Sequence, residues 1–342
     1  MLAQAAMLRD LGAQPVMLGI GDAVPPGGAE THLLRPSGPP VLGYAPGLRR
    51  ALDGVRLDLL HLHGIWQYPS LAGSRWAART GRPYLISPHG MLDPWITARG
   101  QWKKRLARGA WERRSWRRAS SFHALTNAEA DDIAQEAGPV RIVTIPNAAP
   151  AVATAVAGER PPVLLYLGRI HPKKNLSALV AAWKDAHPHL PTGARLVVAG
   201  WGTEADLANL REAMDSVPAC RFIGPAGGVE KVGLLAQARF LALPSLSEGL
   251  PIAVLEAWAH GTPTLMSQSC HIPDGYGNGA AIDCGTEAST VAQAIRQAFA
   301  LPIPEWHSMS AAARQLAQTR FARATVVRSW ERTYAELLGS AA

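Results

Sequence analysis

Short apolar runs alternate with helical patterns over most of this 342-residue chain, and the alternation constrains the fold more than any other feature. The apolar runs cover residues 16–20, 57–62, 83–87, 121–124 and 141–145, then 163–167, 195–199, 221–223, 241–243 and 264–266. Helical patterns lie between them, at about 2–11, 70–79, 102–118 and 129–136, then 176–187, 204–214, 229–238 and 251–260. Such alternation is typical of parallel sheets covered by helices. We therefore predict an α/β protein with two Rossmann-like, doubly wound domains that face each other across a cleft.

The alternation is interrupted once, by a segment rich in Ala and Pro between residues 146 and 162. We interpret residues 149–162 as a linker between a first domain, residues 1–148, and a second domain, residues 163–321. The length fits two domains of roughly 150 residues each. Hydrophobic residues make up 48% of the chain and charged residues 18%, so both domains can build a core.

Several classes of protein are disfavoured by composition. No apolar run approaches the roughly 18 residues of a membrane span, and residues 1–11 lack the pattern of a signal peptide. The three cysteines, Cys220, Cys270 and Cys284, form no CxxC motif. These features predict a cytoplasmic protein without structural zinc.

The most specific motif lies between Pro244 and Pro263. It places Glu248 in a turn and Glu256 eight residues later, in a helix that Pro251 is suited to begin. The two carboxylates would flank unpaired backbone N–H groups, which attract phosphate. The spacing alone is weak evidence, because exposed helix carboxylates are common. A ligand with a sugar and a ribose on either side of a diphosphate would fit this arrangement.

With its flanking residues, the motif Ser-Glu-Gly-Leu-Pro-x4-Glu-Ala-x-Ala-x-Gly-x-Pro resembles the E-x7-E signature of the retaining GT-B glycosyltransferases of family 4. The segment from Gly168 to Lys174 is similar to the G-R-x4-K segment of that family. The resemblance implies that Arg169 and Lys174 hold the donor diphosphate. Two cations and a helix N-terminus can stabilise a departing nucleoside diphosphate without a metal. A solvated basic turn is the simpler alternative.

The resemblance also assigns the other site residues. It implies that Glu248 binds donor-sugar hydroxyls, that Glu256 binds the ribose, and that His89 lies against the donor sugar. The remaining donor-binding positions that it implies are Gly168, Gly200, Phe222, Ile223, Gly224, Gly249, Leu250, Pro251 and Ile252. The turn at residues 270–275 departs from the family's Gly-rich form and leaves the roles of His271 and Asp274 open.

Two histidine-containing segments of the first domain resemble those of bacterial exopolysaccharide glycosyltransferases in the same family. They are His61-Leu-His63-Gly-Ile-Trp66, and the segment from Ser87 to Trp95 that contains His89. His61 and His63 share one face of a strand, which makes a metal pair conceivable. Without a third ligand we predict no metal site, and strand-end packing is the simpler interpretation.

The resemblance runs from about Leu52 to a last helix at about 322–342, which is expected to pack back on the first domain. It fails at the front, where members of the family open with a strand and a glycine-rich loop. This chain opens with a helix instead. We therefore expect the first strand of the N-terminal domain to be missing, by truncation or because the fold dispenses with it.

The predicted function is metal-independent, retaining transfer of a hexose from a nucleotide diphosphate sugar, without a cofactor. The expected acceptor is a glycan or a lipid-linked oligosaccharide, in surface polysaccharide synthesis. One alternative is an inactive nucleotide-sugar-binding protein, and another is a GT-B nucleotide-sugar epimerase. A nicotinamide dehydrogenase is disfavoured because no G-x-G-x-x-G follows a strand.

The positive charge is concentrated in the first domain. Residues 1–150 hold 18 Lys and Arg against 11 Asp and Glu, a net charge of +7, and residues 99–118 alone hold nine basic residues, one acid and three tryptophans. Trp102, Leu106 and Trp116 can share part of a helical face. The segment is interpreted either as an interfacial helix on anionic lipid or as a helix that buries its tryptophans in the core. No nucleic-acid-binding motif accompanies the charge.

Overall fold

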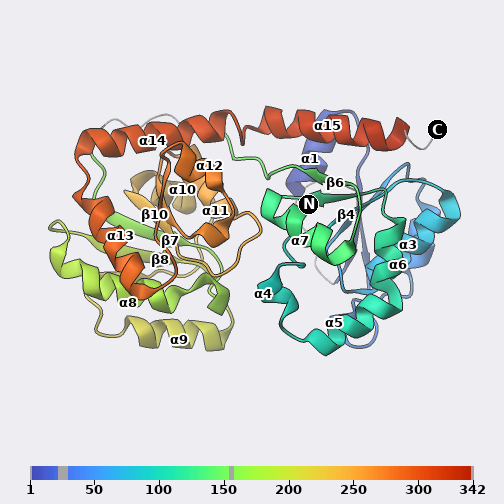
Figure 1. Cartoon of the computed structure of the whole chain (residues 1–342), viewed down its shortest axis with the longest axis horizontal. Helices are drawn as coiled ribbons and strands as arrows, with labels where there is room; N and C mark the ends of the chain where they lie inside the picture. The colour runs from blue at the N-terminus through green and yellow to red at the C-terminus, as the bar shows by residue number, and fades with distance from the viewer. Residues whose placement is uncertain (1, 22–29, 154–157, 340–342) are drawn as a thin grey trace. The chain divides into compact units, whose positions relative to one another are not determined.

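A computed structural model describes residues 2–21, 30–153 and 158–339 of the chain (Figure 1). The chain divides into two compact units, residues 1–146 with 326–342, and residues 147–325. Strands pair in parallel throughout, with helices between them, which confirms the predicted α/β class. Residues 154–157 of the predicted linker lie outside the described residues, and its other residues form no helix or strand. No helix in the described ranges is both long and apolar enough to cross a membrane.

The main sheet of the first unit has the order β3-β4-β5-β6, with bounds Leu60–His63, Tyr84–Ser87, Ser121–Ala124 and Ile142–Thr144. Its two central strands, β4 and β5, are buried along their whole length, as expected for a parallel sheet covered on both faces. The helices of this unit are α1 Leu2–Asp10, α2 Leu48–Gly54, α3 Tyr68–Thr80, α4 Pro94–Thr97, α5 Gln101–Ala107, α6 Arg113–Arg118 and α7 Asn127–Ala137. Because β3 and β4 pair His63 with Ser87, both strands end at the same edge of the sheet.

A separate pair of strands, β1 (Val16–Ile20) and β2 (Glu30–Leu34), belongs to the same unit. Their apolar residues Leu18, Ile20 and Leu34 pack against the core that also supports β4 and β5. Strand β2 is not predicted from the sequence, because its first residues are polar and only its last two, Leu33 and Leu34, are apolar.

The basic segment is helical but does not have one continuous face. A π-helix, Arg108–Glu112, separates α5 from α6. The extra residue per turn of a π-helix changes the direction in which later side chains point. Trp116 is therefore buried in the core, whereas Trp102 and Leu106 are 60% and 64% exposed. The prediction that the three share a face is wrong, and burial of the tryptophans in the core holds for Trp116 but not for Trp102.

The last helix, α15 (Arg323–Gly339), contributes residues 326–339 to the first unit. Tyr334 on this helix contacts His61 of β3, with 2.8 Å between its hydroxyl and Nδ1. The ring of Trp330 lies 4.5 Å from that of His123 on β5. The helix is therefore joined to the strand ends of the first sheet.

The second unit contains a six-stranded parallel sheet with the order β12-β11-β10-β7-β8-β9. Its strands are β7 Val163–Leu167, β8 Arg195–Ala199, β9 Cys220–Phe222, β10 Phe240–Leu243, β11 Thr264–Met266 and β12 Ala281–Asp283. Its helices are α8 Leu176–Ala186, α9 Glu204–Met214, α10 Gly228–Gln237, α11 Ile252–Ala259, α12 Pro273–Gly277, α13 Ala288–Ala300 and α14 Ile303–Gln318. The central strands β7 and β10 are fully buried. The order reverses between β7 and β10, which is the position where open α/β sheets bind ligands.

Candidate functional site

In the second unit, the turns that follow the central strands approach one another closely. The N–H of Gly168 donates to Ala199, and that of Gly200 donates to Gly224, at 3.1 and 2.8 Å. A Cβ atom on Gly200 would lie 1.8 Å from the carbonyl oxygen of Gly168. Only glycine fits this position, so the turns after β7, β8 and β9 are packed as one surface.

Lys174 and Glu248 form an ion pair at this edge of the sheet. Lys174 ends a short 3-10 helix, Pro172–Lys174, after β7, and its Nζ contacts Oε1 of Glu248 in the turn after β10. Ser245 donates to the same carboxylate oxygen at 2.7 Å. The side chain of Glu248 is 6% exposed, so its charge is compensated by Lys174 and not by water.

The second carboxylate of the motif also has a lysine partner. Glu256 lies on α11, and its Oε1 is 2.6 Å from Nζ of Lys231 on α10. Both side chains remain partly accessible, at 19% and 32%. Lys231 is not identifiable from the sequence, because it belongs to no motif and its partner lies 25 residues away.

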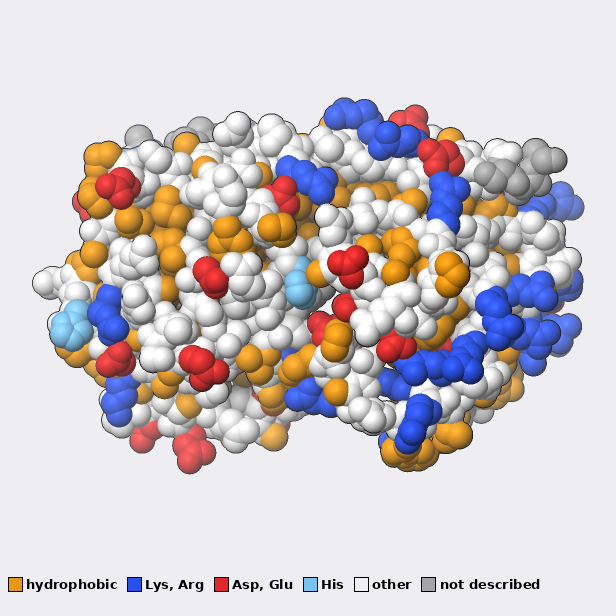
Figure 2. Space-filling view, in the orientation of Figure 1, with side chains coloured by type: hydrophobic (Ala, Val, Ile, Leu, Met, Phe, Trp, Pro, Cys, Tyr) orange, Lys and Arg blue, Asp and Glu red, His pale blue; other side chains and the backbone are white. Residues whose placement is uncertain are grey.

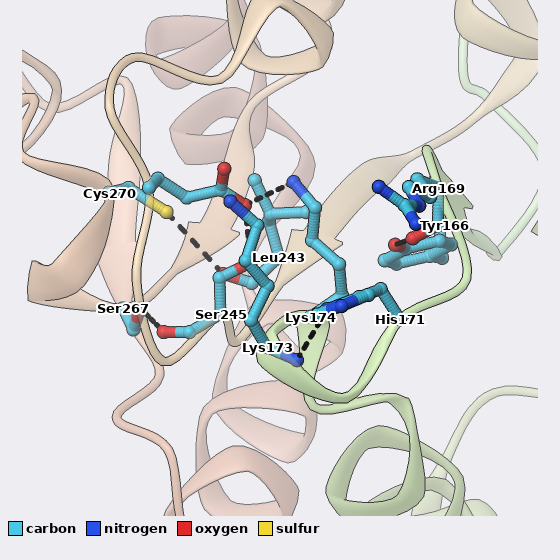
Figure 3. Close-up of polar contacts among 10 residues, drawn as sticks. Tyr166, Arg169, His171, Lys173, Lys174, Leu243, Ser245, Ser267 and Cys270 are labelled. Atoms are coloured by element: carbon cyan, nitrogen blue, oxygen red, sulfur yellow. Dashed lines mark hydrogen bonds and ion pairs between the residues drawn. The ribbon is translucent and has the colours of Figure 1, made fainter. Parts of the chain in front are cut away.

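Arg169 lies in the same turn as Lys174 but is oriented differently (Figure 3). Its carbonyl accepts a hydrogen bond from Tyr166 at 2.8 Å, while its side chain is exposed. In the part of the chain that the structure describes, its guanidinium makes no hydrogen bond or ion pair. One paired and one unpaired cation therefore extend from a single strand-end turn.

The turn after β10 is fixed to its neighbours by backbone and side-chain hydrogen bonds. Leu246 donates to the carbonyl of Lys173 at 2.8 Å. Ser267 donates to the carbonyl of Ser245 at 2.6 Å (Figure 3). Pro251 occupies the N-cap of α11 and makes no side-chain cap hydrogen bond. The first N–H groups of α11 are thus without a side-chain cap, which is the condition for anion binding at a helix start.

The other predicted donor-binding positions also fall in this unit. Gly168, Gly200 and the segments 222–224 and 249–252 all follow strand ends of the six-stranded sheet. Between β11 and β12, Asp274 of α12 is 3.7 Å from Arg320, and His271 adopts a left-handed conformation with φ 55°. This placement does not assign a ligand to either residue.

His89 belongs to the first unit, where four histidines lie along the strand ends. His63 Nδ1 is 2.8 Å from His89 Nε2, and their rings are stacked with an interplanar angle of 8°. The ring of His61 is stacked on that of His63 at 4.2 Å. His123 is buried on β5, and burial lowers its pKa to about 4. Within the described ranges no cluster of three or more His, Cys, Asp or Glu side chains could hold a metal ion.

The hydrogen bonds around His61 and His123 fix their neutral tautomers. His123 Nε2 is 2.7 Å from the carbonyl of Ile145, which only accepts, so this nitrogen carries the proton. His123 Nδ1 then accepts from Ser87 at 2.7 Å, and Ser87 accepts from His61 Nε2 at 2.6 Å. His61 Nδ1 is left to accept from Tyr334. One hydrogen-bond chain therefore runs from the end of the first domain's sheet to α15.

Comparison with protein families covers both units. A Glycosyl transferase 4-like domain matches residues 1–148, and a Glycosyl transferases group 1 domain matches residues 161–300. The chain belongs to the group 1 glycosyltransferases of GT-B fold. This confirms the resemblance on which the sequence analysis relied.

Two curated glycosyltransferases illustrate the relationship. The chain is 29% identical over 280 residues to a Mycobacterium tuberculosis (strain CDC 1551 / Oshkosh) glycogen synthase, covering 76% of this chain and 64% of the relative. It is 29% identical over 227 residues to a GDP-mannose:cellobiosyl-diphosphopolyprenol alpha-mannosyltransferase of Xanthomonas oryzae pv. oryzae (strain PXO99A), covering 63% and 57%. The chain thus spans less than two thirds of the length of these relatives.

Solved GT-B structures share the fold of this glycosyltransferase. HepE of Anabaena, in complex with UDP and glucose, aligns with a TM-score of 0.74 and 15% identity, covering 94% of this chain and 99% of that one. A sucrose-phosphate synthase from Thermosynechococcus elongatus aligns with a TM-score of 0.77 and 18% identity, covering 98% and 91%. At such identities the alignments establish the fold.

Proposed function

We propose that this protein transfers a hexose from a nucleotide diphosphate sugar to a glycan or a lipid-linked oligosaccharide, with retention at the anomeric carbon. The observation that carries the proposal is that both motif carboxylates of the second unit pair with lysines, Glu248 with Lys174 between strand-end turns and Glu256 with Lys231 between α11 and α10. The exposed Arg169 lies in the same turn as Lys174. Such a constellation offers cations for a diphosphate and carboxylates for the hydroxyls on either side of it. The family membership, and the relatives that bind UDP and glucose or are named for GDP-mannose, support a nucleotide-sugar donor.

Each side chain has a defined task in this proposal. Arg169 and Lys174 bind the diphosphate, Glu248 accepts hydrogen bonds from donor-sugar hydroxyls, and Glu256 accepts them from the ribose. Lys174 can bind phosphate without leaving Glu248, because an ammonium group donates three hydrogen bonds. The resemblance assigns His89 of the first unit to the donor sugar, and this role stays a prediction.

The proposed chemistry needs no protein nucleophile. The acceptor hydroxyl attacks the anomeric carbon on the face from which the diphosphate departs, and its proton passes to a departing phosphate oxygen. The leaving group gains negative charge, which Arg169, Lys174 and the start of α11 stabilise. These groups supply the charge compensation that a metal ion would otherwise supply, so we propose that turnover is metal-independent.

Calorimetric titration with UDP, GDP and ADP, and then with UDP-glucose and GDP-mannose, tests the donor site. The proposal expects selective binding to one base, weakened about tenfold or more in both Glu256→Ala and Arg169→Ala. Proton NMR of the product would then show retention as an unchanged anomeric configuration. Absence of binding to every nucleotide by the folded protein would refute the proposed site.

We also propose that the basic segment makes peripheral contact with anionic membranes. Trp102 and Leu106 are exposed on α5, and the only acid of residues 99–118, Glu112, is fully buried. Figure 2 shows Lys and Arg side chains in a band across this part of the surface, with hydrophobic side chains at its lower end. Aromatic and aliphatic side chains surrounded by cations suit an anionic headgroup surface, and a lipid-linked acceptor would be found there.

Co-sedimentation with vesicles that contain phosphatidylglycerol or only phosphatidylcholine tests this contact. The expected result is binding to the anionic vesicles alone, weakened by salt and lost in Trp102→Ala/Leu106→Ala. Arg195→Ala/Arg221→Ala, which removes two exposed arginines of the second unit, is the charge control. Equal binding by the wild type and the Trp102→Ala/Leu106→Ala variant would contradict the proposal.

A further inference from the structure

The turn after β4 has an uncommon backbone conformation at the residue that carries the proposed sugar contact. His89 has φ 56° and the following Gly90 has φ 75°, so two consecutive residues are left-handed. A residue with a Cβ atom adopts this conformation only when its surroundings compensate for the strain. The conformation of His89 therefore needs a cause elsewhere in the structure.

The carboxylate of Glu129 supplies that cause. Glu129 lies in the first turn of α7 and is 3% exposed. Its Oε1 accepts from the N–H of Gly90 at 2.6 Å, and its Oε2 accepts from the N–H of Leu125 at 2.8 Å. The N–H of His89 also faces this carboxylate and opposes the rise in its pKa that burial causes. One buried side chain thus joins the turn after β4 to the turn after β5.

The sequence around Glu129 predicts a different hydrogen bond for its side chain. Thr126 is the N-cap of α7 and accepts from the N–H of Glu129 at 3.2 Å, so the two occupy the positions of a capping box. In a capping box the glutamate bonds back to the N–H of its own N-cap residue. Here its oxygens accept from Leu125 and from the neighbouring turn. The side chain of Glu129 therefore links the turns after β4 and β5 and does not cap its own helix.

The neighbouring turn after β3 is held in the same way. Gly64 and Trp66 have φ 84° and 75°, and the N–H of Trp66 donates to the fully buried Glu112 at 2.5 Å. The two turns touch, because the indole N–H of Trp66 donates to the carbonyl of Met91 at 3.2 Å. Both strand-end turns are therefore set by buried carboxylates, which leaves the rings of His63 and His89 in contact.

We propose that Glu129 is a positioning residue that holds His89 in its left-handed conformation and thereby places its imidazole against His63. Of its expected consequences, only the decrease in kcat rests on the proposed function. A carboxylate is required, because all the groups it faces are N–H donors. An amide would turn its own NH2 toward at least one of them.

Histidine side-chain ¹H–¹⁵N spectra test the placement independently of any activity. Glu129→Gln is expected to shift the signals of His89 and His63, which His89→Ala and His63→Ala assign. Asp131→Asn, an exposed change on the same helix, should leave them in place. Thermal unfolding confirms that each variant is folded. Unshifted His89 and His63 signals in folded Glu129→Gln would overturn the proposal.

Turnover supplies the second readout, with UDP-glucose and GDP-mannose as donor probes. Glu129→Gln should lower kcat about tenfold with little change in the donor KM, as expected for a displaced contact group. In a His89→Ala background the same change should have no further effect, because residues that act through one another are not additive. Equal losses in both backgrounds would show that Glu129 does not act through His89. If the wild type turned over neither donor, the proposed function would fail while the spectra still decided the placement.

Discussion

Lys231 on α10 and Glu256 on α11 form an ion pair, with 2.6 Å between Nζ and Oε1, although 25 residues separate them. The same unit contains a second such pair, Lys174 with Glu248. Each carboxylate of the family motif therefore has a cationic partner from a neighbouring element. An ion pair with remaining exposure orients its carboxylate and still leaves lone pairs for ligand hydroxyls.

Removing Lys231 should weaken nucleotide binding because the carboxylate of Glu256 is no longer held in place, and not because the nucleotide loses a direct contact. We expect Lys231→Ala to lower the affinity for the selected nucleoside diphosphate several-fold, and less than Glu256→Ala. The double variant should bind like Glu256→Ala alone, because the lysine acts through the carboxylate. Titration calorimetry measures all three, with Lys184→Ala, an exposed change on α8, as the control. Additive losses would indicate that Lys231 contacts the nucleotide itself.

Arg169, in the turn after β7, should contribute more to diphosphate binding than its neighbour Lys173. Arg169 is exposed, and a guanidinium that binds a diphosphate contributes about 1.5 to 3 kcal/mol. We expect Arg169→Ala to weaken diphosphate binding about tenfold or more, and Lys173→Ala to change it less than about twofold. A fluorescent nucleotide displacement assay would measure both. Equal effects would indicate a diffuse basic surface in place of a diphosphate site.

The sequence was sufficient to predict the elements that have strong local signals. Strands β1, β5, β7, β8 and β11 have the predicted bounds, because each is a short apolar run bounded by turn residues. Gly200, which the resemblance implied as a donor-binding position, is also the glycine that approaches Gly168 closely. Local pattern and fold agree at these positions, as is expected of a natural sequence.

Features that depend on tertiary partners were not predictable. The half-exposed strand β2 has no apolar alternation strong enough to reveal it, and the π-helix before α6 changes the helical face without a local signal. Lys231 and Glu129 resemble ordinary helix charges in sequence. Their partners come from other elements, so only the folded chain identifies them.

Stability should depend on pH through the buried histidines of the first unit. Burial lowers the pKa of His123 from its ordinary 6.5 to about 4, and it lowers that of His61 as well. Between pH 6.5 and about pH 4, the unfolded chain binds more protons at His123 than the folded chain does. The free energy of unfolding therefore decreases as the pH falls through this interval. His123 alone contributes a loss of at most about 3 kcal/mol, complete below pH 4.

Urea unfolding of the wild type and His123→Gln between pH 7.5 and 4.5 measures this dependence. Glutamine can still donate to Ile145 but has no group that titrates in this interval. The variant should be less stable than the wild type at pH 7.5, and its stability should fall less steeply with decreasing pH. Parallel pH profiles would show that His123 is not the group responsible.

Two glycine substitutions in the second unit should have opposite effects. The Cβ of alanine at position 200 would lie 1.8 Å from the carbonyl oxygen of Gly168, which forces the turns after β7 and β8 apart. At Gly233, within α10, a Cβ would meet no atom within 4 Å. We expect Gly200→Ala to lower the free energy of unfolding by about 2 kcal/mol or more. Gly233→Ala should raise it by about 0.5 to 1 kcal/mol, because alanine favours a helix.

Nucleotide titration of the same two proteins separates stability from the site. Gly200→Ala should lose affinity even at temperatures where it is fully folded, because the displaced backbone lies beside Arg169. Gly233→Ala should bind like the wild type, although it lies two residues from Lys231 on the same helix. If folded Gly200→Ala kept its full affinity, the strand-end turns after β7 and β8 would not form part of the nucleotide site, and the diphosphate would have to be placed closer to the start of α11.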